Sequence, residues 1–552
     1  PDPAARRPQA QRRVGCCDVA VPRPTPLRWT SVRTLADLLG ASAADLPDVS
    51  VSGVTLDSRA VVSGDLYAAL PGTRAHGADF VESAASLGAA AVLTDPDGAR
   101  RVAAAGVGLP VLVVDSPRAV LGEVSAEIFG TRDLPLRMLG ITGTNGKTTT
   151  AYLVHSALTA LGDATGLIGT VETRIGDERL DSVRTTPEAP VLHGILAVMA
   201  QRGLGTCVME VSSHALAQHR VDGVVYDVAL FTNLSQDHLD FHDGMEDYFA
   251  AKASLFTPQR ARRGLVCVDD AWGRRLASEA TIPVQTIATL HAGQEATEGS
   301  ADAAAAAATG GAGSADWLIT VDAADPAAFH LTGPGVDLHL RSRLPGDFNV
   351  TNTAMAAAAL ILLGEDVDAV GAAVLTDPHV PGRMEAVTGP QGSPRALVDY
   401  AHTPEAIRAA LHALRPSTPG TLVVVTGAGG DRDRDKRHAM GEAAAEVADL
   451  VVVTDDNPRS EDPSSIRTAL LGGVEAARAG GRHGIRGLAI GDRREAIREA
   501  VAAVWSEGGA ATVAVVGKGH ETGQEIAGVV HPFDDRAELA HALDLAASSA
   551  TR

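Results

Sequence analysis

The chain has 552 residues, a hydrophobic fraction of 45% and a formal net charge of -21. Its length exceeds what one hydrophobic core supports and predicts about three or four domains. The acidic charge argues against broad binding to nucleic acids or anionic membranes, and no apolar run reaches the roughly 18 residues of a membrane span. Four cysteines, Cys16, Cys17, Cys207 and Cys267, fit neither a disulfide framework nor a zinc pattern. We therefore expect a cytoplasmic protein.

The first part of the chain predicts a tail followed by a small domain. Residues 1–30 are rich in arginine and proline and lack the apolar stretch of a secretory signal, so we expect a disordered tail. Over 31–134, short apolar runs at 66–70, 89–93 and 111–114 alternate with helical patterns. This alternation predicts an α/β domain.

A glycine-rich loop in the next segment, 135–381, is the most informative motif. It follows an apolar run at 136–141, precedes a helical pattern at 151–161, and consists of Gly143, Thr144, Asn145, Gly146, Lys147, Thr148 and Thr149. Glycines let backbone N–H groups approach phosphate oxygens, the lysine adds positive charge, and the threonine after it suits magnesium. The glycine spacing departs from the usual Walker pattern, and the alternative is a glycine turn with a surface lysine. We predict that the loop binds ATP.

Two further apolar runs, 206–211 and 228–231, end in residues that suit a metal ion. Glu210 ends the first run, and a carboxylate at the carboxyl end of a parallel strand is well placed to hold magnesium. His238 lies in the polar stretch after the second run. The alternatives are a helix-capping glutamate and a surface histidine. Lys252 lies in a helical stretch, and taken alone we interpret it as a solvated lysine.

Five apolar runs alternate with helical patterns in the segment 382–552 and predict a Rossmann-like, doubly wound sheet. These runs are 397–400, 422–426, 450–454, 488–490 and 512–516. Arg383 lies in the turn before them, from which its guanidinium can reach a γ-phosphate when domains close. Residues 292–316, in the preceding segment, are rich in alanine and glycine, and we interpret them as a flexible surface insertion.

Polar loops follow these runs and would gather at the carboxyl edge of one sheet, where ligands bind in such folds. The stretch from Asp399 to His402 suits a nucleotide. Three of these loops offer both signs of charge to a zwitterion. They contain Arg432, the stretch from Asp456 to Arg459, and Glu521. Arginine suits a ligand carboxylate and Glu521 suits an ammonium group. Each loop alone could be an ordinary surface turn, but together they predict an amino-acid site.

Together these motifs resemble the Mur ligases of bacterial peptidoglycan synthesis over about residues 31–533. The nucleotide motif is shared with folylpolyglutamate ligases, whereas the stretches 456–459 and 517–521 are more specific. Within the family, the chain is most similar to the ligases that add 2,6-diaminopimelate to UDP-N-acetylmuramoyl-L-alanyl-D-glutamate. The resemblance implies an α/β fold with a domain for the UDP substrate (31–134), a P-loop ATPase-like domain (135–381) and a Rossmann-like amino-acid domain (382–552). We expect a monomer that uses ATP and Mg²⁺.

The resemblance also assigns residues to each ligand. It implies that the phosphate loop, Asn349, Asp399 and His402 bind ATP, and that Thr148, Glu210, His238 and Lys252 hold Mg²⁺. The implied UDP-substrate contacts are Leu56, Ser58, Thr73, Arg74, Ala75, Thr185, Thr186, Ser212, Gln218 and Arg220. The implied diaminopimelate contacts are Arg432, Asp456, Asn457, Pro458, Arg459, Gly517 and Glu521. The implied catalytic residues are Lys147, Glu210, His238, Lys252 and Arg383.

Two of these residues carry specific chemical expectations. Lys252 matches the family's carbamylated lysine, and a carbamate forms only from a neutral amine, so a pocket must depress the ordinary lysine pKa of about 10.4. Arg459 matches an arginine that lysine-adding relatives lack. Its guanidinium can pair with the distal carboxylate of diaminopimelate, and an unpaired arginine would reject lysine.

The resemblance implies that ATP phosphorylates the D-glutamyl side-chain carboxylate and that the diaminopimelate amine attacks the acyl phosphate. Three alternatives stay open at this point. They are a ligase that adds a dipeptide to a longer UDP precursor, a ligase that adds glutamate to folate, and a phosphate-loop ATPase that works as a regulator. The loops at 399–402 and 456–459 argue against the first two.

Overall fold

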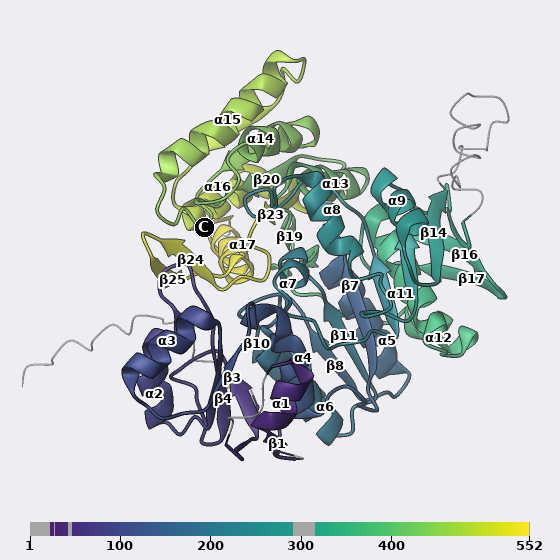
Figure 1. Cartoon of the computed structure of the whole chain (residues 1–552). Helices are drawn as coiled ribbons and strands as arrows, with labels where there is room; N and C mark the ends of the chain where they lie inside the picture. The colour runs from purple at the N-terminus through teal and green to yellow at the C-terminus, as the bar shows by residue number, and fades with distance from the viewer. Residues whose placement is uncertain (1–21, 27, 42–46, 291–314, 551–552) are drawn as a thin grey trace, which may run out of the picture.

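The computed structural model describes residues 22–26, 28–41, 47–290 and 315–550, which form three α/β units (Figure 1). Most of the predicted tail (1–30) and insertion (292–316) lies outside the described residues. In the described part of the tail segment, Arg23 pairs with Asp65 and Arg28 pairs with Glu127. The first unit therefore holds this stretch through ion pairs.

Within the described ranges, every helix is too short or too polar to cross a bilayer.

The first unit is a four-stranded parallel sheet covered by helices on both faces. Its strands, in spatial order, are β3 (Gly53–Thr55), β4 (Asp65–Ala69), β5 (Ala91–Thr94) and β6 (Val111–Val113). Its other elements are β1 (Thr30–Ser31), α1 (Val32–Leu38), β2 (Ser50–Val51), η1 (Gly77–Phe80), α2 (Val81–Ser86), α3 (Pro96–Ala105) and α4 (Pro117–Phe129). Short side chains cap these helices: Ser31 accepts hydrogen bonds at the start of α1, and Asp95 does so at α3.

The second unit contains an 11-stranded sheet in the order β10-β9-β8-β11-β7-β12-β13-β14-β15-β16-β17. Its strands are β7 (Arg137–Thr142), β8 (Thr165–Ile168), β9 (Glu172–Ile175), β10 (Glu178–Asp181), β11 (Thr206–Glu210), β12 (Val228–Phe231), β13 (Gly264–Cys267), β14 (Val284–Leu290), β15 (Trp317–Val321), β16 (Ala328–Gly333) and β17 (Val336–Arg341). The strands from β8 to β15 in this order run parallel, and antiparallel strands extend both edges.

Helices cover both faces of this central sheet. The helices are α5 (Lys147–Ala160), α6 (Ala189–Gln201), α7 (Ser213–Ala217), α8 (Met245–Ala253), α9 (Ala271–Glu279), α11 (Asp347–Leu362) and α12 (Val367–Ala373). Side chains of α5, α11 and α12 form the core on one face, and those of α6 to α9 form the core on the other. Because β7 lies between β11 and β12, the loops after these three strands meet at one edge. The strand register aligns the carboxyl ends of the three strands, since Ile141 pairs with Glu210 and Thr142 pairs with Phe231.

The third unit is doubly wound, as the sequence predicts. Its six-stranded sheet has the order β18-β19-β23-β20-β21-β22 and is parallel except for β18. The strands are β18 (Glu385–Ala386), β19 (Arg395–Asp399), β20 (Leu422–Thr426), β21 (Leu450–Val453), β22 (Arg486–Ala489) and β23 (Thr512–Val516), with the hairpin β24 (Gly523–Ile526) and β25 (Val529–Pro532) beside them. The helices are α13 (Pro404–Leu414), η3 (Arg415–Ser417), α14 (Lys436–Val447), α15 (Pro463–Ala479), α16 (Arg493–Val504), η4 (Trp505–Ala510) and α17 (Asp535–Ala550).

The order of the strands in this sheet creates a crevice at the carboxyl ends of β20 and β23. Helices α13 to α15 pack on one face and α16 and α17 pack on the other. After β22, the chain returns to place β23 between β19 and β20. The connections from β20 and β23 therefore leave toward opposite faces, and the crevice between their carboxyl ends is where ligands bind in such folds. The predicted loops at 427–437 and 517–521 open onto this crevice.

A buried ion pair, Arg493 with Asp535, joins α16 to α17, and Arg493 also donates to the Val516 carbonyl at the end of β23. We expect Arg493→Ala to destabilise the third unit by about 3–5 kcal/mol, because it leaves the carboxylate buried without a partner. Urea unfolding measures this loss. The matched control is Arg494→Ala, which removes a partly exposed pair with Glu538 and should cost less than about 1 kcal/mol. Equal losses in the two variants would contradict this account of the pair.

Candidate active site

The phosphate loop connects β7 to α5, and two glycines let it pass close to its neighbours. Gly143 and Gly146 have φ values of +143° and +87°. A Cβ on Gly143 would lie 1.9 Å from the Thr232 hydroxyl oxygen, and one on Gly146 would lie 2.5 Å from the Asn352 Oδ1. Any larger residue would therefore displace the loop. Its backbone amides lie at the N-terminal end of α5, where the helix dipole favours an anion.

Lys147 folds back over this loop. Its Nζ donates to the carbonyl oxygens of Gly143 at 2.9 Å and Thr144 at 2.8 Å. Burial lowers the pKa of Lys147, and the nearby Arg383 guanidinium lowers it further, while Glu210 and Asp237 oppose the shift. An anion bound on the loop would therefore stabilise the protonated, positively charged form of this amine.

An oxygen cluster lies beside the loop, around Glu210. The Thr148 hydroxyl donates to the Glu210 carboxylate at 2.9 Å, and the backbone and hydroxyl of Thr170 donate to the same carboxylate at 2.7 and 3.0 Å. Glu210 is only 1% exposed. The Glu210 side chain caps no helix, because α7 begins after Ser212, whose side chain makes the cap. A carboxylate and a hydroxyl in contact form an oxygen donor set that Mg²⁺ prefers.

Lys252 is buried, so the interpretation of this residue as a solvated lysine is wrong. It is 1% exposed, and its Nζ donates to the Gly143 carbonyl at 2.7 Å and lies 4.5 Å from the centre of the Tyr248 ring. Two lysine amines therefore share one acceptor. Burial and the charge of Lys147 lower the pKa of Lys252 well below its ordinary value. A neutral amine is the form that reacts with carbon dioxide, so this environment fits a carbamate.

His238 and Asp237 follow β12 on the same edge. Burial lowers the pKa of His238 to about 3, against the opposing charge of Asp237, so the imidazole stays neutral and can offer a lone pair. Burial alone would raise the pKa of Asp237, but its interactions with His238, His402 and Lys436 hold it below the ordinary value. His238 has a positive φ of 57°, which turns the chain sharply at this point.

The third unit reaches this edge through Arg383. The Arg383 guanidinium donates to the Thr148 hydroxyl at 3.3 Å and stacks 4.4 Å from the centre of the Tyr400 ring. Asp399 accepts the backbone N–H groups of Met384 and Ala401 at 2.7 and 2.8 Å, and so fixes the turn that carries Arg383. Burial raises the pKa of Asp399. The structure thus gives Asp399 a role in holding this turn, in addition to any contact with a nucleotide.

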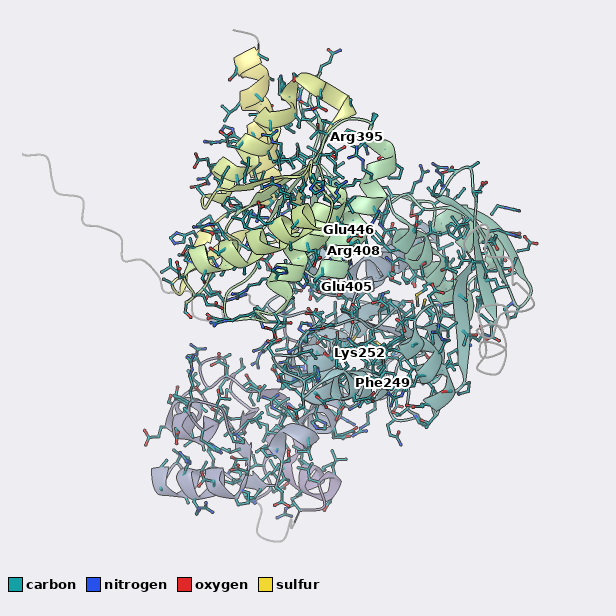
Figure 2. The ribbon with its side chains drawn as sticks, turned by 90° about the horizontal axis from the view of Figure 1, so that it is seen from above. Phe249, Lys252, Arg395, Glu405, Arg408 and Glu446 are labelled. Carbon is teal, nitrogen blue, oxygen red and sulfur yellow. The ribbon has the colours of Figure 1, made fainter. Side chains whose placement is uncertain are left out.

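Further contacts close the interface between the second and third units. The Asp237 carboxylate lies 4.0 Å from His402 Nε2 and 3.7 Å from Lys436 Nζ, and Arg432 lies 3.4 Å from Asp240. A cavity of about 280 Å³ lies between the loops that carry Asp240 and Arg432. Figure 2 shows Lys252 in the central unit, beneath the third unit that carries Arg408 and Glu446.

The predicted amino-acid loops meet around a buried lysine, Lys518. It is 0% exposed, and its Nζ lies 3.0 Å from Asn457 Oδ1, 3.1 Å from Glu521 and 3.6 Å from Asp456. Asn457 also donates to Glu521 at 2.9 Å. A Cβ on Gly517, whose φ is +115°, would lie 2.7 Å from the Asp456 carboxylate. One network therefore brings together the stretches 456–459 and 517–521.

Arg459 and Arg432 lie on the rim of this network. Arg459 donates to the Gly430 carbonyl at 2.7 Å, and its Nε lies 3.3 Å from the Glu525 carboxylate. Its side chain is partly exposed, so the guanidinium has donors left for a ligand. Arg432 extends from the loop after β20 toward the central unit. Pro458 lies in the turn between Asn457 and Arg459.

The residues assigned to the UDP substrate form two groups. In the central unit, Thr186 donates to the Glu210 carbonyl at 2.9 Å and accepts the Ser212 N–H at 3.1 Å. Thr185 and Arg220 belong to the same group: Thr185 shares a 3.0 Å hydrogen bond with Thr170, and Arg220 donates to Gln218. The second group follows strands of the first unit: Leu56 is half-buried, Ser58 is buried, and Thr73, Arg74 and Ala75 are exposed.

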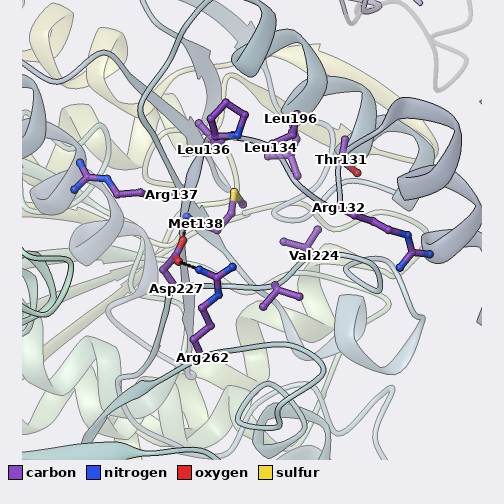
Figure 3. Close-up of a pocket in the computed structure, with 12 residues that line it drawn as sticks. Thr131, Arg132, Leu134, Leu136, Arg137, Met138, Leu196, Val224, Asp227 and Arg262 are labelled. Carbon is purple, nitrogen blue, oxygen red and sulfur yellow. Dashed lines mark hydrogen bonds and ion pairs between the residues drawn. The ribbon is translucent and has the colours of Figure 1, made fainter. Parts of the chain in front are cut away.

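Asn349 is linked to the phosphate loop through Asn352, whose side chain packs against Gly146. Asn349, at the start of α11, donates to the Pro345 carbonyl at 2.7 Å and accepts from Asn352 at 3.2 Å, so both ends of its amide have partners in this unit. Figure 3 shows a cavity of about 220 Å³ lined by Leu136, Met138 and Val224 among others. It lies at the start of β7, opposite the phosphate loop, and contains none of the predicted site residues.

Sequence reasoning missed three residues that shape this site: Asp237, Tyr400 and Lys518. Each was part of a motif we singled out, but its own role depends on partners distant in the sequence. Asp237 meets Lys436, Tyr400 stacks on Arg383, and Lys518 joins Asp456 to Glu521. The usable signal was a charged or aromatic residue at or within a few residues of the end of an apolar run in a parallel sheet.

Family models match most of the chain. The Mur ligase family, catalytic domain matches residues 50–128, the Mur ligase middle domain matches 141–360, and the Mur ligase, glutamate ligase domain matches 382–519. The chain is 52% identical to a UDP-N-acetylmuramoyl-L-alanyl-D-glutamate--2,6-diaminopimelate ligase of Streptomyces coelicolor, over 95% of this chain and 98% of that protein. The chain belongs to the Mur ligase family.

Solved structures of Mur ligases share the fold. A UDP-N-acetylmuramoyl-L-alanyl-D-glutamate--2,6-diaminopimelate ligase is 30% identical, with a TM-score of 0.61 over 94% of this chain and 99% of that chain. A MurF ligase of Thermotoga maritima in complex with ADP is 17% identical, with a TM-score of 0.56 over 91% of this chain and 99% of that chain. The second likeness concerns the fold alone. The predicted three-part α/β architecture of a Mur ligase is thus confirmed.

Proposed function

We propose that this Mur ligase joins 2,6-diaminopimelate to the D-glutamyl side-chain carboxyl of UDP-N-acetylmuramoyl-L-alanyl-D-glutamate, using ATP and an acyl phosphate. The main observation behind the proposal is that the loop-bearing edges of the central sheet and of the third unit's sheet meet at one interface. The phosphate loop of the central unit and the amino-acid loops of the third unit face one interface, which Arg383, Asp237 and Lys436 bridge. The 52% identity to a ligase of that name supports the same substrates. Cys207 and Cys267, which are free and buried in the described part of the chain, fit a reducing cytoplasm.

The phosphate loop would bind the ATP triphosphate through its backbone amides and Lys147. Lys147 would turn from the Gly143 and Thr144 carbonyls to a phosphoryl oxygen, which a short rotation of its flexible chain permits. Arg383 would place a second cation at the γ-phosphate. Both cations would stabilise charge that develops as the phosphoryl group passes to the substrate carboxylate.

The oxygen cluster beside the loop fits Mg²⁺. Glu210 and Thr148 already touch, His238 is neutral, and these donors border the phosphate loop. When bound, Mg²⁺ would neutralise phosphoryl oxygens and so lower the barrier to transfer. Thr170 would keep the Glu210 carboxylate oriented through its two hydrogen bonds.

Lys252 would serve as a carbamate, an anion that balances the charge around Gly143. The amine would lose a proton and bond through nitrogen to the carbon of CO₂. The change would place an anion beside the Lys147 amine, and the two groups would attract each other when Lys147 is protonated. The low pKa of Lys252 supports this chemistry because it supplies the neutral amine.

The third unit would supply the nucleophile. Asp456, Asn457 and Glu521 would bind ammonium and polar groups of diaminopimelate, and Arg459 and Arg432 would bind carboxylates. A neutral amine of the ligand would attack the acyl carbon. The tetrahedral intermediate would collapse with cleavage of the acyl C–O bond, release of inorganic phosphate and loss of a proton from nitrogen. The closed interface would exclude water from the acyl phosphate.

The first prediction from this mechanism concerns selectivity. Purified protein should release ADP rapidly only with both the UDP-linked dipeptide and diaminopimelate, and lysine should replace diaminopimelate poorly. In Arg459→Ala, kcat/KM for diaminopimelate should fall about 100-fold, because a charge-assisted contact worth about 1.5–3 kcal/mol is lost. The kcat/KM for lysine should change much less, so the ratio of kcat/KM for diaminopimelate to kcat/KM for lysine should fall. A coupled ADP assay measures both.

The matched control is Arg434→Ala, which removes an exposed arginine from a neighbouring loop and should leave the ratio unchanged. Equal kcat/KM values for lysine and diaminopimelate in the unmodified protein would contradict the proposed specificity.

The second prediction concerns Lys252. Lys252→Ala should lower kcat by about 100-fold or more, because several kcal/mol of electrostatic stabilisation is lost. Acetate or formate should restore part of the rate, since a small carboxylate can enter the vacated space and supply the missing anion. The measurement is kcat against carboxylate concentration.

Lys252→Arg is the control: it fills the space with a cation, so acetate should not rescue it. In the unmodified protein, ¹³C-bicarbonate should give a carbamate NMR signal that weakens as pH falls, because protonation removes the neutral amine. Rescue of Lys252→Ala by a small alkylamine but not by carboxylates would show that the ammonium form is the active one.

A further inference from the structure

Two histidines and an aspartate gather on the hairpin of β16 and β17, at one edge of the central sheet. They are His330, Asp337 and His339. The sheet order places four strands between β7 and β16, a separation of about 24 Å at the usual spacing of roughly 4.8 Å between strands. Figure 1 shows this hairpin at the outer end of the sheet. The cluster is therefore separate from the nucleotide edge.

The strand pattern forces the three side chains onto one face. Phe329 and Leu331 are buried against the core, so their neighbour His330 points to the solvent face. His339 lies directly opposite His330 in the antiparallel register, and Asp337 lies two residues before it on the same face. Both Asp337 and His339 are exposed.

The hairpin holds this face in a fixed register. Gly333 pairs with Val336 across a two-residue turn, in which Gly335 has a φ of +71°. Gly333 packs on the buried Trp317, so closely that a Cβ would lie 2.2 Å from its ring. The backbone beneath the cluster is thus ordered before any ligand arrives, which lowers the entropic cost of binding.

The side chains bring three ligand atoms of the right kind together. All three lie within 4.8 Å of one another, with a His330 Nε2 to Asp337 Oδ1 separation of 2.5 Å. The two imidazole rings stack with their centroids 4.3 Å apart and 5° from parallel. Arg341, the nearest cation on this strand face, pairs with Asp325. Two imidazoles and a carboxylate suit Zn²⁺ and similar ions, at about 2.0–2.2 Å from each ligand, whereas Mg²⁺ prefers oxygen ligands alone.

We propose that His330, Asp337 and His339 form a surface site for one divalent transition-metal ion of the Zn²⁺ class. The ion would take the place of the proton shared by His330 and Asp337. Rotation of the exposed His339 side chain would bring the third ligand to bonding distance. Because the cluster is open to solvent, water would complete the coordination.

Isothermal titration of the full, tag-free chain with ZnCl₂, in excess Mg²⁺, tests the proposal. The unmodified protein should bind one Zn²⁺ with micromolar affinity at this site. His330→Ala and His339→Ala should each weaken that binding at least tenfold, and the shape-preserving Asp337→Asn should weaken it about tenfold. His483→Ala, which removes an exposed histidine of the third unit, is the control and should leave the isotherm unchanged.

The competing explanation is that the hydrogen bond and ring stacking only stabilise the hairpin. Under that explanation, the variants would lower the thermal unfolding midpoint without changing Zn²⁺ binding. A Zn²⁺-dependent rise in the midpoint that Asp337→Asn reduces would support the proposal. Isotherms of His330→Ala and His339→Ala that match the unmodified protein, or no Zn²⁺ binding at all, would overturn it.

Discussion

The half-buried amine of Lys147 and the buried amine of Lys252 share the carbonyl oxygen of Gly143, and the rest of the site is arranged around this pair of amines. Lys147 and Lys252 both donate to that oxygen, and the pKa of each is depressed by burial. Two cations cannot stay this close in a dry site without anions nearby. Glu210 and Asp237 supply part of that negative charge. ATP and a carbamate would supply the rest, which makes the bound state the electrostatically favourable one.

The same constraint explains why the third unit must close on the central one. Arg383 brings another cation to Thr148, and Asp237 gathers Lys436 and His402 across the interface. Asp237 and Lys436 are better compensated with the units together than apart, whereas Arg383 adds a cation that an anionic ligand would compensate. Asp399 contributes by fixing the turn that carries Arg383. Substrate binding and domain closure therefore favour each other, which is how an acyl phosphate can form away from water and meet an amine.

The sequence was most informative where local patterns decide the structure. Continuous apolar runs located β12, β20 and β23 to the residue. The two outermost strands at each end of the central sheet, β9 with β10 and β16 with β17, escaped detection because polar residues alternate along them, as expected for strands with one face in solvent. The strands β4 and β5 are displaced by one or two residues from their predicted apolar runs.

Site residues were predictable to the extent that their motifs are local. The phosphate loop is a continuous motif, and so is the stretch 456–459. The burial of Lys252 was not visible from its helical neighbours alone, because the carbonyl of Gly143 that covers its amine comes from tertiary packing, whereas the ring of Tyr248 lies one turn earlier on α8. The same holds for Lys518, whose partners Asp456 and Asn457 lie on another loop, the one after β21. Their roles in catalysis and binding stay predictions.

The most direct test of the acyl-phosphate route follows an oxygen atom. The D-glutamyl side-chain carboxylate of the UDP-linked dipeptide would be labelled with ¹⁸O and turned over with ATP and diaminopimelate. Phosphorylation of the carboxylate, followed by attack of the amine on the acyl carbon, transfers one labelled oxygen to each inorganic phosphate released, and mass spectrometry of that phosphate detects it. Released phosphate without the label would mean that water attacks ATP, and it would contradict the account.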